Sequence, residues 1–216
     1  MKTDALIAML ARGPVAADAR TTERRLAAAA LLGALVAEAC ALATFGLRHD
    51  IAAAVPLPAF WLKIAFPATL AAAAAAFAAT CLLARPGAAL GGLRCALIAP
   101  LVVVWAVAGW ALIDPPAGER MALVTGHSAF ARVASVALLA LPGFVAAFAA
   151  LRALAPTRPR AARACAGLLA GALAATLYAF HCDEMEAPFV AVWYVLGMLL
   201  PTALGAVLGP RLLCRA

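Results

Sequence analysis

Long apolar runs alternate with short polar gaps along the whole chain. Each of six runs is close to the roughly 20 residues that a helix needs to cross the hydrocarbon core of a bilayer. These runs cover approximately residues 26–47, 59–84, 95–113, 133–151, 164–180 and 187–209. Backbone groups in lipid must bond within their own segment, and Ala71–Ala76 lacks the period of two that a barrel strand would show. The pattern therefore predicts an all-α membrane bundle of six transmembrane helices.

The composition supports this prediction and limits what lies outside the membrane. Of the 216 residues, 67% are hydrophobic and 12% are charged, and the mean hydropathy is +1.02, which is typical of a membrane protein. We divide the chain into an N-terminal segment (1–25), a transmembrane domain (26–210) and a short tail (211–216). The lipid bilayer is accordingly its first expected partner.

The distribution of basic residues predicts the orientation. Thirteen of the 17 Lys and Arg residues lie in the N-terminal segment, in the gaps after the second and fourth runs, and in the tail. The opposite gaps hold most of the acidic residues. By the positive-inside rule, the chain should lie in a bacterial inner membrane with both termini in the cytoplasm. The net charge of +7 then serves insertion and contact with anionic headgroups, and we expect no nucleic-acid binding.

The N-terminal segment carries an amphipathic pattern of its own. Thr3 or Asp4 can cap a short helix that ends at Gly13 and Pro14. Its apolar stripe consists of Leu6, Ile7, Met9 and Leu10. Such a stripe can lie on the membrane surface, or it can enter a groove on a soluble partner protein. The pattern alone leaves both interpretations open.

The sequence contains none of the common catalytic motifs. A phosphate-binding loop, an H-E-x-x-H zinc motif, a G-x-S-x-G elbow and a C-x-x-C pair are all missing. We expect neither enzymatic activity nor a bound cofactor. A membrane enzyme that uses His127 and Ser128 ranks last among the hypotheses, and we interpret Gly126–Ser128 as a helix cap.

Glu38 is the one acidic residue well inside a predicted span. An ionised group at that depth costs roughly 2.5–3.5 kcal/mol, so Glu38 should be neutral or paired. Lys63, near the outer end of the second span, has a suitable depth for a partner. The pair either fixes helix packing or belongs to an ion pathway. The second interpretation gives an alternative function, a small cation or metal transporter that uses Glu38 and the His181–Cys182 mouth.

A second group of residues, capable of binding a metal ion or of being oxidised, is expected on the outer side. Cys182 follows His181 and precedes three acidic residues, and His127 is expected on the same side. Imidazole, thiolate and carboxylate groups can bind a transition-metal ion transiently, and an exposed thiol can be oxidised. The simpler interpretation is a polar hairpin with a free thiol. We expect most of the other cysteines to be small apolar core residues.

Several short blocks, taken in order, resemble a known family. They are Met1–Asp4 with Leu6 and Ile7, Phe60–Lys63, Leu154–Pro159, Tyr178–Cys182, Trp193–Gly197 with Pro201, and Leu208–Leu213. Together they make the chain similar to the NrsF family of six-span membrane anti-sigma factors. The resemblance implies that the protein holds an extracytoplasmic-function sigma factor at the membrane and releases it under metal or oxidative stress. It also implies that the stripe at Leu6, Ile7, Met9 and Leu10 binds that sigma factor.

The resemblance further implies a pair of sensing cysteines, of which this chain matches one. Cys182, preceded by His181, corresponds to the second cysteine, but Arg132 stands near the position of the first. Cys182 could pair with Cys40, pair between protomers, or bind a metal ion with His181 and His127. The sequence leaves these alternatives open, as it does the inducing ligand and the oligomeric state.

Overall fold

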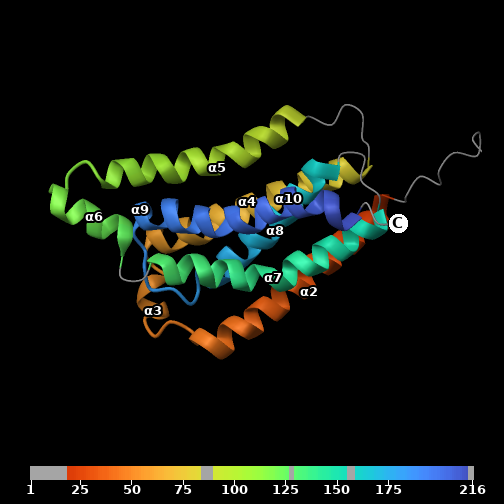
Figure 1. Ribbon diagram of the computed structural model, residues 1–216. Helices are drawn as coiled ribbons and strands as arrows, with labels where there is room; N and C mark the ends of the chain where they lie inside the picture. Colours follow the sequence, from red (N-terminus) through yellow and green to blue (C-terminus); the bar gives the residue numbers. More distant parts are fainter. Residues whose placement is uncertain (1–18, 84–89, 127–128, 155–158, 214–216) are drawn as a thin grey trace, which may run out of the picture.

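The computed structural model describes residues 19–83, 90–126, 129–154 and 159–213 of the chain (Figure 1). Within these residues, six helices are long and apolar enough to cross a membrane. This confirms the predicted all-α bundle. The apolar stripe of the N-terminal segment, His127 and the end of the tail lie outside the described residues.

The helices follow the predicted runs closely. The long helices are α2 (Ala19–Phe45), α4 (Pro58–Leu83), α5 (Leu90–Ala111), α7 (Ala129–Leu154), α8 (Pro159–Tyr178) and α10 (Val195–Leu213). Short elements connect them at one end of the bundle: α3 (Ile51–Ala54), α6 (Ala117–Thr125), α9 (Ala187–Phe189) and the π-helix η1 (Val190–Tyr194). The α2 helix begins seven residues before the apolar run that predicted it. The last part of the N-terminal segment is therefore continuous with the first span.

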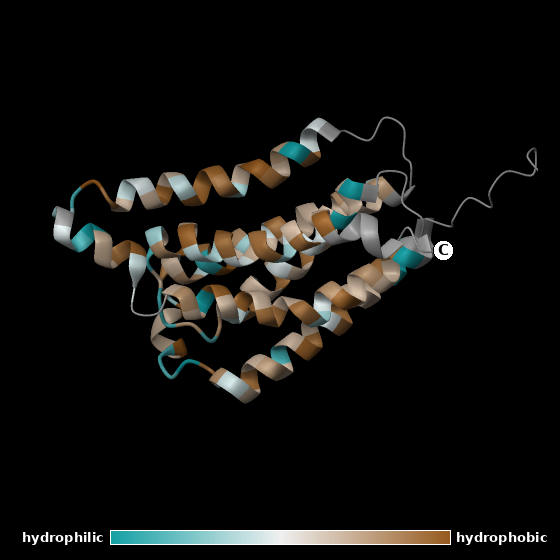
Figure 2. Cartoon of the chain, viewed as in Figure 1, coloured by the Kyte–Doolittle hydropathy of each residue, from teal (hydrophilic) through white to brown (hydrophobic). Residues whose placement is uncertain are grey.

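The bundle is built around α8. This helix contacts α10, α4, α7 and α2, and 67% of its span is buried inside the protein. By contrast, α5 lies at one edge of the bundle in Figure 1, and only 11% of its span is buried. Its outward side chains, such as Val102 and Trp105, are more than half exposed. In a bilayer, lipid would cover these faces, and Figure 2 shows apolar residues along all six long helices.

Close backbone contact joins α8 to α10. A Cβ atom on Gly167 would lie 2.2 Å from the carbonyl oxygen of Pro201, and one on Gly205 would lie 2.5 Å from that of Arg163. Real Cβ atoms do not approach other atoms so closely, so glycine is required at both positions. Small residues commonly allow this kind of approach between membrane helices. Gly167 and Gly171 also have the four-residue spacing that such contacts often show.

Three prolines lie inside helices without ending them. Pro67, Pro100 and Pro142 fall within α4, α5 and α7, each of which is assigned as one helix. Neighbouring helices and local adjustments satisfy the backbone groups that a proline frees in a membrane helix. The three helices therefore continue through their prolines.

Candidate signal-sensing site

The chain turns sharply after α8 and brings Cys182 into the interior. The backbone N–H groups of His181 and Cys182 both donate to the carbonyl of Tyr178, at 3.0 and 3.1 Å, and these bonds close the turn. The loop then runs outward through Asp183 and Glu184 to α9. Cys182 itself is 0% exposed. The sequence suggested an exposed thiol, so that expectation was wrong: the loop is polar, but its first residue packs into the core.

Two cations from other elements hold the carbonyl groups of this loop. Lys63, on α4, is 1% exposed and donates to the carbonyl oxygens of Cys182 at 2.7 Å and Glu184 at 2.5 Å. Arg48, in the α2–α3 connection, donates to the same Cys182 carbonyl at 3.2 Å. Backbone carbonyls thus solvate the buried ammonium group. Its charge also lies 5.7 Å from the ring centre of Tyr194, on η1.

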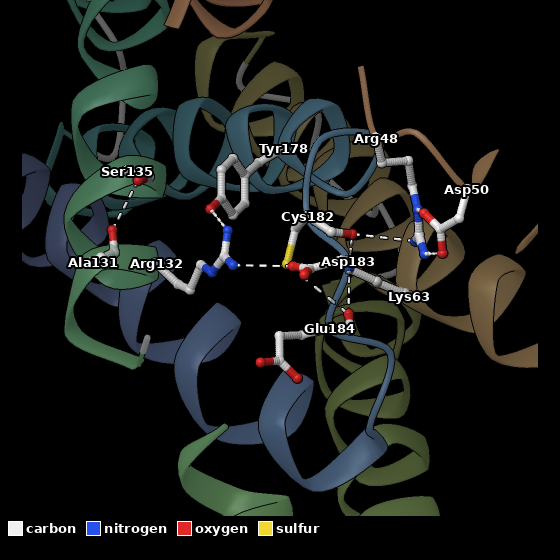
Figure 3. Close-up of polar contacts among 10 residues, drawn as sticks. All are labelled: Arg48, Asp50, Lys63, Ala131, Arg132, Ser135, Tyr178, Cys182, Asp183 and Glu184. Carbon is white, nitrogen blue, oxygen red and sulfur yellow. Dashed lines mark hydrogen bonds and ion pairs between the residues drawn. The ribbon is translucent and has the colours of Figure 1, made fainter. Parts of the chain in front are cut away.

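A third cation approaches the loop from the opposite side. Arg132, near the start of α7, donates to the Tyr178 hydroxyl at 2.5 Å and to an Asp183 carboxylate oxygen at 3.1 Å. Figure 3 shows Arg132 on one side of Cys182, with Arg48 and Lys63 on the other. The loop after α8 is therefore fastened to α4, to α7 and to the α2–α3 connection.

Arg48 is itself oriented by a carboxylate. Its Nε and Nη2 atoms donate to the two oxygens of Asp50 at 2.7 and 2.6 Å. This hydrogen bonding raises the pKa of Arg48 and lowers that of Asp50. Both groups stay charged over the physiological range, although Asp50 is exposed and its pair with Arg48 is screened by water.

His181 points away from the cysteine that follows it. Its Nδ1 atom lies 2.5 Å from the carbonyl oxygen of Gly46, just beyond the end of α2, and its Nε2 atom lies 3.4 Å from Glu38 Oε1. The imidazole therefore faces the first span with both nitrogens. Gly46 has a φ of 67°, a conformation in which glycine readily ends a helix, and this places its carbonyl at the site.

Comparison with known proteins places this arrangement in a family. The family model described as "Negative regulator of sigma F" (NrsF) matches residues 10–214. The chain belongs to the NrsF family.

Two curated relatives are similar to the chain over almost their whole length. A probable anti-sigma-F factor NrsF of Azospira oryzae is 43% identical over 213 residues, and the anti-sigma-F factor NrsF of Caulobacter vibrioides is 35% identical over 216 residues. In both cases the alignment covers 99% of this chain and 99% of the relative. No solved structure matches the chain.

The structure separates two residues that the sequence suggested as partners in this NrsF family member. Glu38 lies against His181, whereas Lys63 donates to the loop carbonyls. Both residues were expected at the same depth, but depth does not determine which side of a helix each residue occupies. The suggested pair of Glu38 and Lys63 was therefore wrong.

The suggested metal ligands are only partly described. Among the described residues, no group of three His, Cys, Asp or Glu side chains could hold a metal ion. Both ring nitrogens of His181 face α2 and its end, so the ring is not directed toward Cys182. His127 lies outside the described residues, and its role stays a prediction. The described cysteines, Cys40 and Cys182 included, are free thiols in the structure.

Sequence reasoning missed most of the residues that surround Cys182. The unrecognised contacts come from Arg48, Arg132, Tyr178 and Tyr194. One feature of the sequence could have identified the cations among them. Lys and Arg are scarce on the outer side of a membrane protein, so the few predicted there are candidates for a specific role. Three of the four Lys and Arg residues predicted there, all except Arg120, reach the Cys182 loop.

Proposed function

We propose that this NrsF family member is a membrane-embedded anti-sigma factor for an extracytoplasmic-function sigma factor. The chain would lie in the bacterial inner membrane with both termini in the cytoplasm. Its N-terminal segment would hold the sigma factor, and a metal or oxidative signal at the outer site would release it. The observation that carries the proposal is the 43% identity, over 99% of both chains, with a probable anti-sigma-F factor.

The continuity of α2 supports a connection between the sigma-binding segment and the signal-sensing site. The helix runs from Ala19 through the first span to Phe45, so one rigid element joins the N-terminal segment to the Cys182 site. The apolar stripe at Leu6, Ile7, Met9 and Leu10 would supply the binding surface. Side chains of this kind contribute roughly 1.5–3 kcal/mol each when fully buried, before the cost of ordering the segment.

Deleting residues 2–12 is expected to abolish retention of the sigma factor. The deletion removes the stripe but keeps Arg20, Arg24 and Arg25, which orient the first span. Tagged full-length and shortened proteins would be purified from mildly solubilised membranes of the native host, and bound proteins identified by mass spectrometry. We expect a sigma factor with the full-length chain and at least about tenfold less with the shortened one.

Lys2→Ala and a Leu6→Ala, Leu10→Ala double variant provide the matched comparison. Lys2 precedes both the suggested cap and the stripe, so its variant should retain the sigma factor, while the double variant should lose most of it. Recovery of no sigma factor with an intact full-length protein would contradict the proposal. Dependence of metal export on Glu38 would then favour the transporter hypothesis.

Cys182→Ser is expected to abolish induction while sigma binding persists. The signal-sensing role is assigned to the thiol, whereas the proposed binding surface precedes Ala19 in the sequence, and Ala19 is at the opposite end of α2 from the Cys182 site. A sigma-dependent reporter would be measured after exposure to hydrogen peroxide and, separately, to Cd²⁺. Cys95→Ser, an exposed thiol on α5, serves as the control. Loss of sigma binding in Cys182→Ser would refute a purely sensory role. If Cys40→Ser also fails to induce the reporter with hydrogen peroxide or Cd²⁺, Cys40 is indicated as the thiol partner of Cys182.

A further inference from the structure

Glu38 and His181 form an unusual polar contact inside the bundle. The Glu38 Oε1 atom lies 3.4 Å from His181 Nε2, and the His181 side chain is 0% exposed. The second carboxyl oxygen, Oε2, and His181 Nε2 are both buried and have no hydrogen-bond partner. Buried polar atoms without partners cost about 1–3 kcal/mol each, so the proximity of these two groups calls for an explanation.

The chemistry of the ring determines what the contact must be. The Gly46 carbonyl can only accept a hydrogen bond, so the Nδ1 atom beside it carries a hydrogen. In a neutral ring with that tautomer, Nε2 is an acceptor. A carboxylate is also an acceptor, so the contact is favourable only with a proton between Glu38 and His181. With such a proton, His181 contacts α2 and its C-terminal end through both nitrogens.

This contact joins the sensing loop to one helix only. His181 is the residue before Cys182, and both groups that its nitrogens face belong to α2 or to its C-terminal end. The other residues that hold the loop are Lys63 on α4, Arg132 on α7 and Arg48 in the α2–α3 connection. Of these contacts, the one between His181 and Glu38 is made with α2 itself, so movement of the loop would reach this helix through the imidazole.

A tight backbone contact lies between Glu38 and the cytoplasmic end of α2. A Cβ atom on Gly33 would lie 2.3 Å from the Cα atom of Gly143, on α7. At a rise of about 1.5 Å per residue, Glu38 is about 8 Å from this contact along the helix, and Ala19 is about 21 Å away on the other side. A tilt of α2 about Gly33 would therefore move its cytoplasmic end nearly three times as far as Glu38.

We propose that Glu38 and His181 transmit a change at Cys182 to α2, which tilts about the contact between Gly33 and Gly143 and thereby moves the N-terminal segment. This inference rests on the proposed function. It assigns positioning roles to Glu38 and His181 in signal transmission.

Coupling between Cys182 and the sigma-binding segment can be tested without a known inducer, because coupling between two sites acts in both directions. If a change at Cys182 alters the affinity for the sigma factor, binding of the sigma factor must alter the state of Cys182. The probe is alkylation by N-ethylmaleimide of a full-length chain that keeps Cys182 as its single cysteine, in lipid nanodiscs. We expect the sigma factor recovered with the wild-type protein to change the alkylation rate of Cys182 at least about fivefold, the lower end of typical coupling.

Glu38→Leu is expected to remove this effect while the sigma factor still binds. Glu38→Gln should retain it, because its amide N–H can donate to the Nε2 atom of His181 in place of the shared proton. Ala39→Leu, at the adjacent exposed position of α2, is the matched control and should also retain the effect. If Glu38→Leu does not purify as a monodisperse protein, Glu38→Ala makes the same comparison.

The possible failures are distinguishable. Absence of sigma binding by the wild-type chain refutes the proposed function itself. Sigma binding that leaves Cys182 alkylation unchanged in the wild-type chain shows that the two sites are not coupled, and it overturns this inference alone. Full retention of the effect in Glu38→Leu likewise overturns it, because the signal then passes through other contacts of the loop.

Discussion

Gly167→Ala is expected to lower the free energy of unfolding of the bundle by about 2 kcal/mol, within the range seen for overpacked cores. The added Cβ would lie 2.2 Å from the carbonyl oxygen and 2.8 Å from the carbonyl carbon of Pro201. These are backbone atoms, so no side chain can rotate away, and α8 and α10 must separate. Because α8 is the most buried span, its other contacts would loosen as well.

Gly109→Ala is the matched control for this prediction. Gly109 also lies inside a membrane helix, but a Cβ there would meet nothing within 4 Å. Alanine is intrinsically the better helix former by about 1 kcal/mol, so this variant should be neutral or slightly more stable. Titration of the detergent-solubilised proteins with a denaturing detergent, followed by circular dichroism, measures both changes. Equal stability of the two variants would contradict the close contact between α8 and α10.

Lys63→Met is expected to increase the rate at which maleimide alkylates Cys182 by about 30-fold. Cys182 is buried, so alkylation requires a local opening of the loop. In the wild-type protein, opening breaks the hydrogen bonds from Lys63 to the carbonyls of Cys182 and Glu184. Hydrogen bonds from a charged donor contribute about 1.5–3 kcal/mol each, but Lys63→Met also removes the cost of burying the ammonium group. A net loss of about 2 kcal/mol corresponds to roughly 30-fold. Methionine keeps the length of the side chain but donates no hydrogen bond.

Arg120→Met is the matched control. Arg120, on α6, is a cation at the same end of the bundle, but it donates to the carbonyls of Ile113 and Pro115 instead. Its replacement should leave the alkylation of Cys182 unchanged. The measurement uses the single-cysteine chain and follows alkylation by intact mass. An unchanged rate in Lys63→Met would mean that the remaining contacts hold the loop closed without the lysine.

The transmembrane helices were predictable because their signal is local. A run such as 164–180 is apolar over the length of a span, and no distant residue is needed to recognise that α8 crosses the bilayer. Close helix contact at Gly167 and Gly205 likewise requires the absence of a side chain, whichever helix is the partner. Hydropathy alone does not set the helix ends. The α2 helix begins at Ala19 although the apolar run begins at residue 26, since a helix can continue through polar residues into water.

The candidate site was predictable only in part. Cys182 and His181 were recognised from their neighbours in the loop and from the family resemblance. Their burial and their partners were not, because these depend on which helices pack against the end of α8. Lys63 illustrates the difference: its depth suggested Glu38, but α4 presents the ammonium group to the carbonyls of the loop.

The sequence by itself determined the solvent, the spans and the family, since hydropathy and short blocks of sequence are properties of consecutive residues. Only the tertiary structure decided that Cys182 is enclosed by three cations and that His181 faces Glu38 on α2. The physical reason is that helix neighbours and side-chain directions are set by packing between segments far apart in the chain. Partners such as Arg48, Lys63 and Arg132 are brought together by that packing and by no local pattern.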